Sequence, residues 1–312
     1  MQIYHGLPEL PLARPSALTI GNFDGVHLGH RALIHTMLES ARRRGWQGGV
    51  LTFHPHPAAV LRPHTNQLYL TTMDERLELL SGIGVDFTVV YPFTLATANL
   101  PAAEFVAQVA RAVNLAGLWV GPDFALGRGR EGNVEVLAAL GRTMGFEVYV
   151  IEPQTIGGVE VRSGRIRQLL LEGDVAAAAE GLGWRYRVSG VVVPGASRGH
   201  RIGFPTANLA VAAERLLPAN GVYATWAWIE NGGDNGLQCY ASVTNIGVRP
   251  SFDNGQRTVE AHLLDFSGNL YGRRMALEFV ERLRPEMKFP GVDALRSQIQ
   301  QDIARARAIL RA

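Results

Sequence analysis

Leu18-Thr19-Ile20-Gly21-Asn22-Phe23-Asp24-Gly25-Val26-His27-Leu28-Gly29-His30 is the stretch that decides the fold of the first half of the chain. Residues 18–20 form a short apolar run typical of a buried strand, and residues 31–44 carry apolar side chains at helical spacing before Gly45. A glycine-rich turn between a strand and a helix lets backbone amides approach a phosphate, and the helix N-terminus adds partial positive charge. The two histidines add donors at the same place, so the stretch predicts a polyphosphate-binding site.

The histidine pair alone is compatible with an ordinary tight turn whose side chains lie at the surface. The complete string G-x-F-D-G-x-H-x-G-H, however, resembles the signature of the nucleotidyltransferase superfamily, whose members transfer AMP or CMP from a nucleoside triphosphate. This resemblance implies that His27 and His30 contact the phosphates during the transfer. It also implies nucleotide-binding roles for the rest of the string, namely Gly21, Asn22, Phe23, Asp24, Gly25 and Gly29.

A second string, Gly203-Phe204-Pro205-Thr206-Ala207-Asn208, lies far downstream and resembles the signature of riboflavin kinases. Two signatures in this order resemble the bacterial bifunctional riboflavin kinase/FMN adenylyltransferases, also called FAD synthetases, over essentially the whole chain. The resemblance implies phosphorylation of riboflavin to FMN with ATP, and then transfer of AMP from ATP to FMN, which gives FAD and pyrophosphate. It also implies a requirement for Mg²⁺.

The first half of the chain alternates short apolar runs with helical patterns. Strands are predicted at 16–20, 49–53, 87–90, 118–120 and 147–151, and helices at 29–44, 74–81, 101–116 and 133–144. Strands separated by helices predict a Rossmann-like parallel sheet, which binds ligands beyond the carboxyl ends of its strands. We therefore expect the turn at 21–30, residues 52–57 and residues 121–124 to surround one crevice.

The pattern changes near residue 185. Strands predicted at 186–193, 221–229, 237–245, 257–264 and 275–284 follow one another without helices, which indicates an antiparallel barrel. The resemblance implies the six-stranded Greek-key barrel of riboflavin kinases, and residues 292–310 predict a terminal amphipathic helix. The predicted domains are 1–184, which includes short linking helices at 163–172 and 174–181, and 185–312.

The composition is that of an ordinary globular protein, with 47% hydrophobic and 19% charged residues over a length of 312 that predicts two domains. The net charge of +2 indicates no general surface for polyanions, so we expect small-molecule substrates and no nucleic-acid partner. The single cysteine, Cys239, excludes an intramolecular disulfide and lies in an apolar run that predicts burial. No signal peptide is recognised in residues 1–15 and no apolar stretch is long enough to span a membrane, which predicts a cytoplasmic protein without a membrane partner. Self-association is compatible with the sequence.

Joining AMP to FMN requires attack by a phosphate oxygen on the α-phosphorus of ATP. The nucleophile is already anionic near neutral pH, so the site needs charge stabilisation rather than a general base. The resemblance places Asp123 beside the adenosine, although Gly-Pro-Asp at 121–123 is also an ordinary turn. It places Ser163 and Arg167 at the phosphates, in a stretch where the family has Ser-Ser-Thr-x-x-Arg at a helix start; the alternative is a solvated helix face.

Arg162 and Gly164 depart from that pattern, because they replace the first serine and the threonine. One hydroxyl donor is therefore missing. We expect Arg162 to compensate through a charge-assisted contact with a phosphate, in which case a threonine at 164 would crowd the site. The alternative is a weakened adenylyl transfer.

A histidine-rich segment, His54-Pro55-His56-Pro57, resembles a family segment that lines the same crevice. With His64 the two histidines could alternatively form a metal site. That alternative is disfavoured, because no carboxylate is near in the sequence and the prolines stiffen a loop instead of presenting ligands on a helix.

Phosphorylating riboflavin requires a base, because the ribityl hydroxyl is neutral and weakly acidic. Glu260 is the candidate, since residues 258–262 resemble the segment that carries the catalytic glutamate of riboflavin kinases. A carboxylate on a strand is otherwise usually just solvated. Val259, Ala261 and Leu263 alternate with Glu260, which has the period of a strand.

Glycines, cations and oxygen ligands surround the second signature. The loop at 195–201 is glycine-rich and cationic, which suits triphosphate binding, although it lacks the ending of a P-loop. Thr206 and Asn208 offer hard oxygen ligands, and the resemblance assigns Mg²⁺ to them. In this half of the chain, the resemblance implies that substrates are bound by Gly195, Arg201, Gly203, Pro205 and Arg249. Arg249 lies in the segment 245–252, which resembles a flavin-proximal loop of the family.

Two other functions compete with the bifunctional enzyme. One is a riboflavin kinase with weak adenylyl transfer, which the glycine at 164 motivates. The other is a flavin- or nucleotide-sensing protein that kept the folds and lost the chemistry. The presence of His27, His30 and Glu260 disfavours the second.

Overall fold

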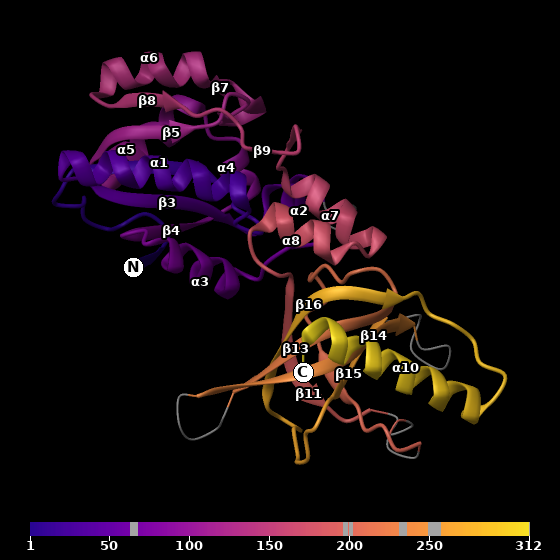
Figure 1. Ribbon diagram of the computed structural model, residues 1–312. Helices are drawn as coiled ribbons and strands as arrows, with labels where there is room; N and C mark the ends of the chain where they lie inside the picture. The colour runs from indigo at the N-terminus through magenta and orange to yellow at the C-terminus, as the bar shows by residue number, and fades with distance from the viewer. Residues whose placement is uncertain (63–67, 196–198, 200–201, 231–235, 249–256, 312) are drawn as a thin grey trace. The chain divides into compact units, whose positions relative to one another are not determined.

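The computed structural model describes residues 1–62, 68–195, 199, 202–230, 236–248 and 257–311. Their contacts divide the chain into two compact units, Met1–Ser163 and Gly164–Ala312, each taken by itself below (Figure 1). Within the described residues, none of the helices combines the length and the apolar character needed to cross a membrane.

The first unit is built on a six-stranded sheet in which every neighbouring pair is parallel, as the sequence predicts. Its order is β1 (Gln2–His5), β4 (Phe87–Pro92), β3 (Gln47–His54), β2 (Ser16–Gly21), β5 (Leu115–Val120) and β8 (Glu147–Val150). The edge strand β1 was not predicted, because its four residues carry no apolar run and are mostly exposed.

Helices cover both faces of this sheet (Figure 1). Residues of α1 (Leu28–Arg44) and α3 (Met73–Ile83) bury one face, and α5 (Ala102–Val113) and α6 (Val134–Met144) bury the other. Successive residues of β2 point to opposite faces of the sheet. Ala17 packs with the residues of α1 and α3, and Leu18 packs with those of α5 and α6. This double burial explains why the strands are short continuous apolar runs.

Several helix ends follow from local sequence signals. Gly45 ends α1 in the left-handed conformation, and Thr72 forms a capping box with Glu75 at the start of α3. The helix predicted at 101–116 is too long, because Asn114 adopts a left-handed φ of 49° and β5 begins at the next residue. The remaining short elements of this unit are α2 (Pro57–Leu61), α4 (Leu95–Ala98), β6 (Ala125–Leu126), η1 (Arg128–Arg130), β7 (Gly132–Asn133), β9 (Thr155–Ile156) and β10 (Val159–Glu160).

The order of the strands reverses beside β2. The chain passes from β2 to β3 and β4 on one side, and later to β5 and β8 on the other. Ligands of open parallel sheets bind outside the carboxyl ends of the strands at such a switch point. The turn at 21–30 leaves β2 at this point.

The second unit contains a closed six-stranded antiparallel barrel, which confirms the predicted architecture. Its order is β11 (Arg187–Val193), β12 (Ala207–Ala210), β15 (Arg257–Leu263), β14 (Leu237–Val248), β13 (Gly221–Glu230) and β16 (Arg274–Arg284). The sequence pattern predicted every strand except β12, whose four residues follow directly on a Pro-Thr turn. The terminal helix α10 (Val292–Leu310) packs against the outer face of β13 and β14.

Apart from Ser163, the two short helices α7 (Ser163–Glu172) and α8 (Val175–Leu182) fall in the second unit, whereas the sequence assigned them to the first domain. The carbonyl oxygen of Leu170 accepts a hydrogen bond from Ala219 N at 2.8 Å, and Arg282 donates to the carbonyl of Glu172. These contacts with the barrel fix the helices there. As predicted, Gly173 ends α7 and Asp174 caps α8.

Cys239 is exposed, which corrects the prediction that it is buried. It lies near the start of β14, directly opposite Trp228 of β13. Ala241 and Val243 share its face of the strand and are buried in the cluster that includes α10. Cys239 is not part of that cluster. The apolar run from which burial was predicted therefore continues past the part of β14 that α10 covers.

Candidate active sites

A cavity of about 370 Å³ opens at the carboxyl ends of β2, β5 and β8 in the first unit. Residues 20–21, 121–124 and 151–154, each just at or after the end of one of these strands, contribute to its wall. The predicted site residues that line it are Gly21, Phe23, His27, Gly29, His30, Asp123 and Ser163. Two of the three segments that the sequence placed around one crevice, 21–30 and 121–124, therefore contribute to this cavity, and residues 52–57 are not among those that line it.

The two histidines form a single unit at the start of α1. Their rings stack at a centroid distance of 3.6 Å, and the edge of Phe23 meets the His30 ring. His27 is the N-cap of the helix, where its Nδ1 accepts a hydrogen bond from His30 N. In the neutral imidazole of His27 the proton then resides on Nε2, which is a donor. The site thus combines imidazole donors with the partial positive charge of a helix N-terminus.

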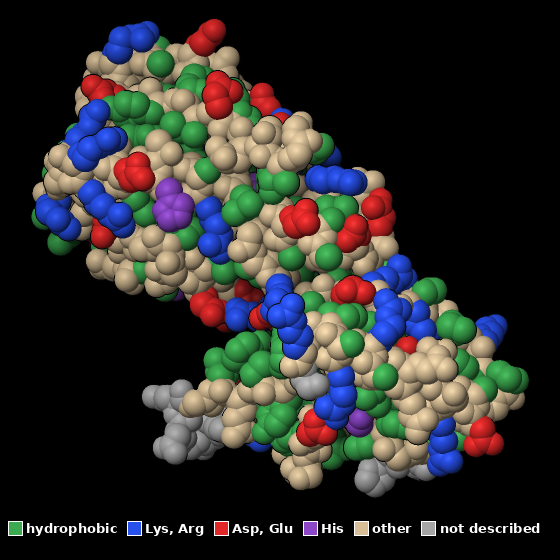
Figure 2. Space-filling model, viewed as in Figure 1, with side chains coloured by type: hydrophobic (Ala, Val, Ile, Leu, Met, Phe, Trp, Pro, Cys, Tyr) green, Lys and Arg blue, Asp and Glu red, His purple; other side chains and the backbone are tan. Residues whose placement is uncertain are grey.

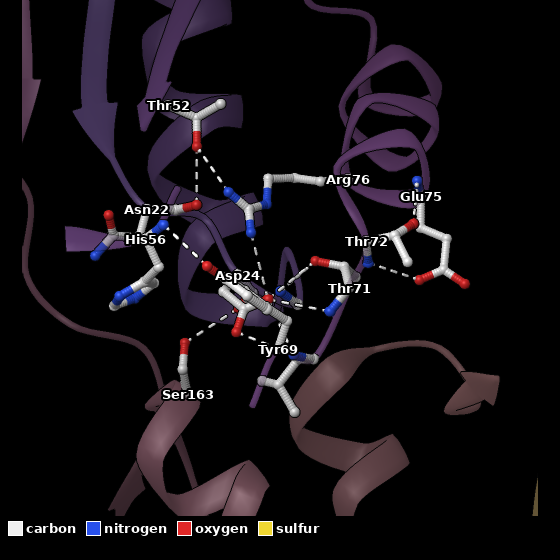
Figure 3. A network of polar contacts seen from close by, with 12 residues as sticks. Asn22, Asp24, Thr52, His56, Tyr69, Thr71, Thr72, Glu75, Arg76 and Ser163 are labelled. Carbon is white, nitrogen blue, oxygen red and sulfur yellow. Dashed lines mark hydrogen bonds and ion pairs between the residues drawn. The ribbon is translucent and has the colours of Figure 1, made fainter. Parts of the chain in front are cut away.

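Three other residues of the signature, Asn22, Asp24 and Gly25, are not among those that line the described cavity. Figure 3 shows Asn22 and Asp24 with their polar partners. The Asp24 carboxylate is 1% exposed and accepts hydrogen bonds from the backbone amides of Leu70 and Thr71. Gly25 N donates to Thr71 Oγ1, and Asn22 O accepts from Thr52 Oγ1. Through these hydrogen bonds, the three residues hold the shape of the turn at 21–30.

Arg162 is paired with carboxylates. Its Nη2 lies 2.6 Å from Glu160 Oε2 and 3.1 Å from Asp123 Oδ2, and the hydrogen bond to Glu160 raises the pKa of the guanidinium. Both ion pairs use Nη2, so the compensating role predicted for Arg162 at the phosphates would fall to its other N–H donors, and it stays a prediction. No protein atom lies within 4 Å of a Cβ built on Gly164, so the protein itself leaves space for a side chain there.

Ser163 and Arg167 both lie on α7, which spans the boundary between the units. Ser163 belongs to the first unit, where its Oγ donates to the carbonyl of Asp24 at 3.1 Å. Arg167 belongs to the second unit. The phosphate-binding role of Arg167 remains a prediction.

The histidine-rich segment after β3 does not contribute to the described wall of the cavity. His56 instead caps α2 through its Nδ1, and its backbone amide donates to Tyr69 Oη at 3.0 Å. His64 lies outside the described residues. Among the residues that the structure describes, no cluster of three His, Cys, Asp or Glu side chains could hold a metal ion.

In the second unit, three polar residues stand in one row across neighbouring strands. Glu260 of β15 is the direct cross-strand partner of Asn208 on β12 and of Asn245 on β14. Directly opposite residues of a sheet point to the same face. The buried neighbours Val259 and Ala261 alternate with Glu260, so the row lies on the outer face of the barrel. The sequence assigned roles to Asn208 and Glu260 and placed Asn245 at the start of the flavin-proximal segment; the register of the strands adds that Asn245 stands beside Glu260.

Thr206 lies two residues before Asn208, beside a second cavity of about 500 Å³. The ring of His262 is bonded through Nδ1 to the carbonyl of Pro205 at 2.7 Å and meets Phe204 edge-on. His262 therefore fixes the backbone immediately before Thr206. The cavity is lined by Pro205, Thr206 and apolar residues that include Ala261, Leu263 and Tyr271.

In the second unit, the structure explains why glycine occupies two of the predicted site positions. Gly203 adopts a φ of 86°, which disfavours any other residue. A Cβ added at Gly195 would overlap the side chain of Asn208, so the chain passes directly against this predicted magnesium ligand. Arg201 and Arg249 lie outside the described residues, and their roles stay predictions.

Gly195→Ala is expected to lower riboflavin phosphorylation by about ten-fold, because the new methyl group displaces the Asn208 amide from its place beside Glu260. FAD formation from supplied FMN should not change. The measurement is the rate of FMN formation at several Mg²⁺ concentrations. Gly291→Ala is the matched control, because no atom lies within 4 Å of its Cβ position. Wild-type kinase activity in Gly195→Ala would show that the close approach of residue 195 to Asn208 does not affect the reaction.

Fold and site together define a parallel α/β unit with a cavity at the carboxyl ends of its strands, followed by an antiparallel barrel with a row of polar side chains. A family model for FAD synthetase matches residues 10–165, and one for riboflavin kinase matches residues 182–310. The chain is 36% identical over 295 residues to the bifunctional riboflavin kinase/FMN adenylyltransferase of Listeria monocytogenes, covering 93% of this chain and 91% of the relative. It is 36% identical over 304 residues to the Escherichia coli K12 protein of the same name, covering 97% and 95%.

The chain belongs to the bifunctional riboflavin kinase/FMN adenylyltransferase family. It is an enzyme that phosphorylates riboflavin to FMN and transfers AMP from ATP to FMN, which confirms the predicted function. Its substrates are riboflavin, FMN and ATP.

A solved structure is similar over the same length. The crystal structure of a protein from Streptococcus pneumoniae, described as a macrolide-efflux protein, gives a TM-score of 0.86 at 29% identity and covers 96% of this chain and 98% of that one. The likeness supports the fold of this chain. The efflux role in that description is not carried over, because the family models describe both halves of this chain as domains of FAD synthesis.

Proposed function

We propose that the cavity of the first unit is the site of adenylyl transfer, with His27 and His30 as the groups that stabilise charge on the phosphates. The observation that supports this most is the stacked histidine pair at the N-terminus of α1, in the wall of a cavity at the switch point of the sheet. The FMN phosphate is its own nucleophile, so imidazole donors and helix amides can supply the stabilisation that the reaction needs. Asp123 lies in the same wall, which supports its proposed contact with the nucleoside.

We further propose that Glu260 is the general base of the kinase, and that Thr206 and Asn208 hold Mg²⁺. The two side chains carry the hard oxygens that this ion prefers, and Asn208 stands directly opposite Glu260. When bound, the ion neutralises charge on the triphosphate. Glu260 accepts the proton of the ribityl hydroxyl as it attacks the γ-phosphorus. The cavity beside Thr206 suits the nucleoside of ATP.

A single time course tests both activities. Purified protein is incubated with riboflavin, ATP and Mg²⁺, and riboflavin, FMN and FAD are separated by chromatography. FMN should rise first and then fall as FAD accumulates. Accumulation of FMN without FAD would identify a kinase whose adenylyl site is weak, and flavin binding without turnover would identify a sensing protein.

The reactants are small molecules, and we propose that the enzyme uses them in the cytoplasm, where ATP is made, without nucleic acid or membrane as a partner. Basic and acidic side chains are interspersed on the face that Figure 2 shows, in line with the net charge of +2. Affinity for a random DNA duplex at low salt would contradict this part of the proposal.

Gly164→Thr is expected to raise FAD synthesis by up to about five-fold, because one added neutral hydrogen bond contributes about 1 kcal/mol and the Cβ position is open. The measurement is the ATP dependence of FAD formation from FMN. Gly82→Thr is the matched control, since this helical glycine of α3 is exposed and its Cβ position is open as well. A fall in FAD synthesis that is specific to Gly164→Thr would mean that the site is adapted to glycine.

A further inference from the structure

The phosphate turn before α1 has an unfavourable backbone. Phe23 and Val26 adopt φ values of 48° and 38°, in the left-handed region that bulky and β-branched residues avoid. Between them Gly25 has a φ of 85°. Such a conformation persists only where surrounding contacts over-determine it, and it is common at functional sites. His27 follows this turn directly, so whatever holds the turn also sets the position of the histidine pair.

The contacts that hold the turn come from the segment between α2 and α3 (Figure 3). Both carboxylate oxygens of Asp24 accept from Leu70 N, and Oδ1 also accepts from Thr71 N. Arg76 of α3 lies 3.5 Å from the same carboxylate and is 2% exposed. A buried charge pair of this kind fixes one geometry, because any displacement separates two charges away from water.

Thr71 connects this anchor to the backbone of the turn. Its hydroxyl donates to Asp24 Oδ1 at 3.1 Å and accepts from Gly25 N at 3.1 Å, and the residue is 1% exposed. One buried hydroxyl thus satisfies the amide at the centre of the strained turn and the carboxylate beside it. Thr71 does not belong to the cavity wall, so it does not contact the nucleotide there.

A second hydroxyl repeats this arrangement at the start of the turn. Thr52 Oγ1 donates to the carbonyl of Asn22 at 2.9 Å and accepts from Arg76 Nη1 at 3.1 Å. The turn is therefore bound at its start and at its centre to side chains that converge on Arg76 (Figure 3).

We propose that Thr71 is a positioning residue for adenylyl transfer: its hydroxyl holds the strained turn at 23–26 so that His27 and His30 present their rings to the phosphates of ATP. The inference rests on the proposed role of the two histidines. It assigns to residues 68–72, which do not line the described cavity, a part in setting the rate of the chemical step.

Thr71→Val is the direct test. The isosteric change leaves Gly25 N without its buried acceptor and removes one bond from Asp24, so the kcat of FAD formation from FMN should fall by about ten-fold or more. The KM for ATP should change less than kcat, because the residue acts on the orientation of the histidines and not on binding. Hydrogen exchange of the amides in residues 22–28 should become faster.

Thr71→Ser keeps the hydroxyl and should restore most of the lost kcat. Thr88→Val is the control for the loss of a buried hydroxyl elsewhere in the same unit, since Thr88 is fully buried on β4. This control should retain the wild-type kcat of FAD formation. Riboflavin phosphorylation should remain unchanged in all three variants.

Several results would overturn the positioning role. The first is an unchanged kcat of FAD formation in folded Thr71→Val. The second is a Thr71→Ser variant as slow as Thr71→Val, and the third is an equal loss of kcat in Thr88→Val. The role of the histidines is tested separately with His30→Ala. If His30→Ala stops the transfer and Thr71→Val does not slow it, only the positioning proposal fails; if His30→Ala is fully active, the proposed site itself is wrong.

Discussion

Replacing Glu260 with glutamine is expected to lower the formation of FMN from riboflavin by about 100-fold or more, while FMN supplied directly is still converted to FAD. The amide keeps the size of the side chain and its place opposite Asn208, but it cannot accept the proton of the attacking hydroxyl. The fall should therefore appear in kcat, and the KM for riboflavin should change little. The measurement is steady-state kinetics of each half-reaction on the same preparation.

Glu278→Gln is the matched control for this change. Glu278 is a partly exposed carboxylate on β16 of the same barrel, where it pairs with Arg185 at 3.2 Å. The control removes a negative charge from the barrel without touching the row that contains Glu260, so its kinase activity should stay near wild type. Kinase activity of Glu260→Gln within a few-fold of wild type would show that this glutamate is not the base.

Much of the fold could be predicted because local patterns and tertiary structure agree. Apolar runs such as residues 18–20 are buried on both faces of a parallel sheet, and their lengths and separators indicate strands joined by helices. β12 was missed for a physical reason. Its strand character comes from pairing with β11 and β15, which are distant in sequence, and not from its own four residues.

The candidate sites were predictable only as far as local motifs reach. The turn at 21–30 carries the residues proposed to bind phosphate in one string, and its place at the switch point follows from the order of the strands. The buried partners of Asp24 are about 46 residues away in sequence, and no local pattern indicates them. The place of Asn245 opposite Glu260 and the hydrogen bond of His262 to Pro205 likewise depend on tertiary structure.

The pairing of Arg162 shows what a local string cannot predict about the neighbours of a side chain. An arginine beside a predicted phosphate-binding string suggests a contact with the anion, and the structure adds Glu160 and Asp123 within salt-bridge distance of its Nη2. A phosphate bound by Arg162 would share the guanidinium with these two carboxylates. The charge of a side chain therefore predicts its ligand only after its neighbours in space are known.

His30→Ala is expected to lower FAD formation from FMN by about 100-fold, while FMN formation from riboflavin is largely unchanged. Loss of one preorganised donor at a site of developing charge costs roughly 3 kcal/mol. His30 lies in the wall of the cavity and stacks on His27, so its removal also withdraws support from the second ring. The kinase residues belong to the other unit of the chain, which is why the two activities should separate. The measurement is the rate of each half-reaction with saturating ATP.

His35→Ala provides the comparison that isolates the effect of position. His35 lies on the same helix as His30, but it is exposed and does not line the cavity. Both variants lose an imidazole from α1 and gain an alanine, which favours the helix, so their effects on folding should be similar. Only His30→Ala should lose adenylyl transfer. A folded His30→Ala variant that loses both activities would contradict the assignment of one reaction to each unit, and equal rates in the two variants would show that the histidine pair does not act on the phosphates.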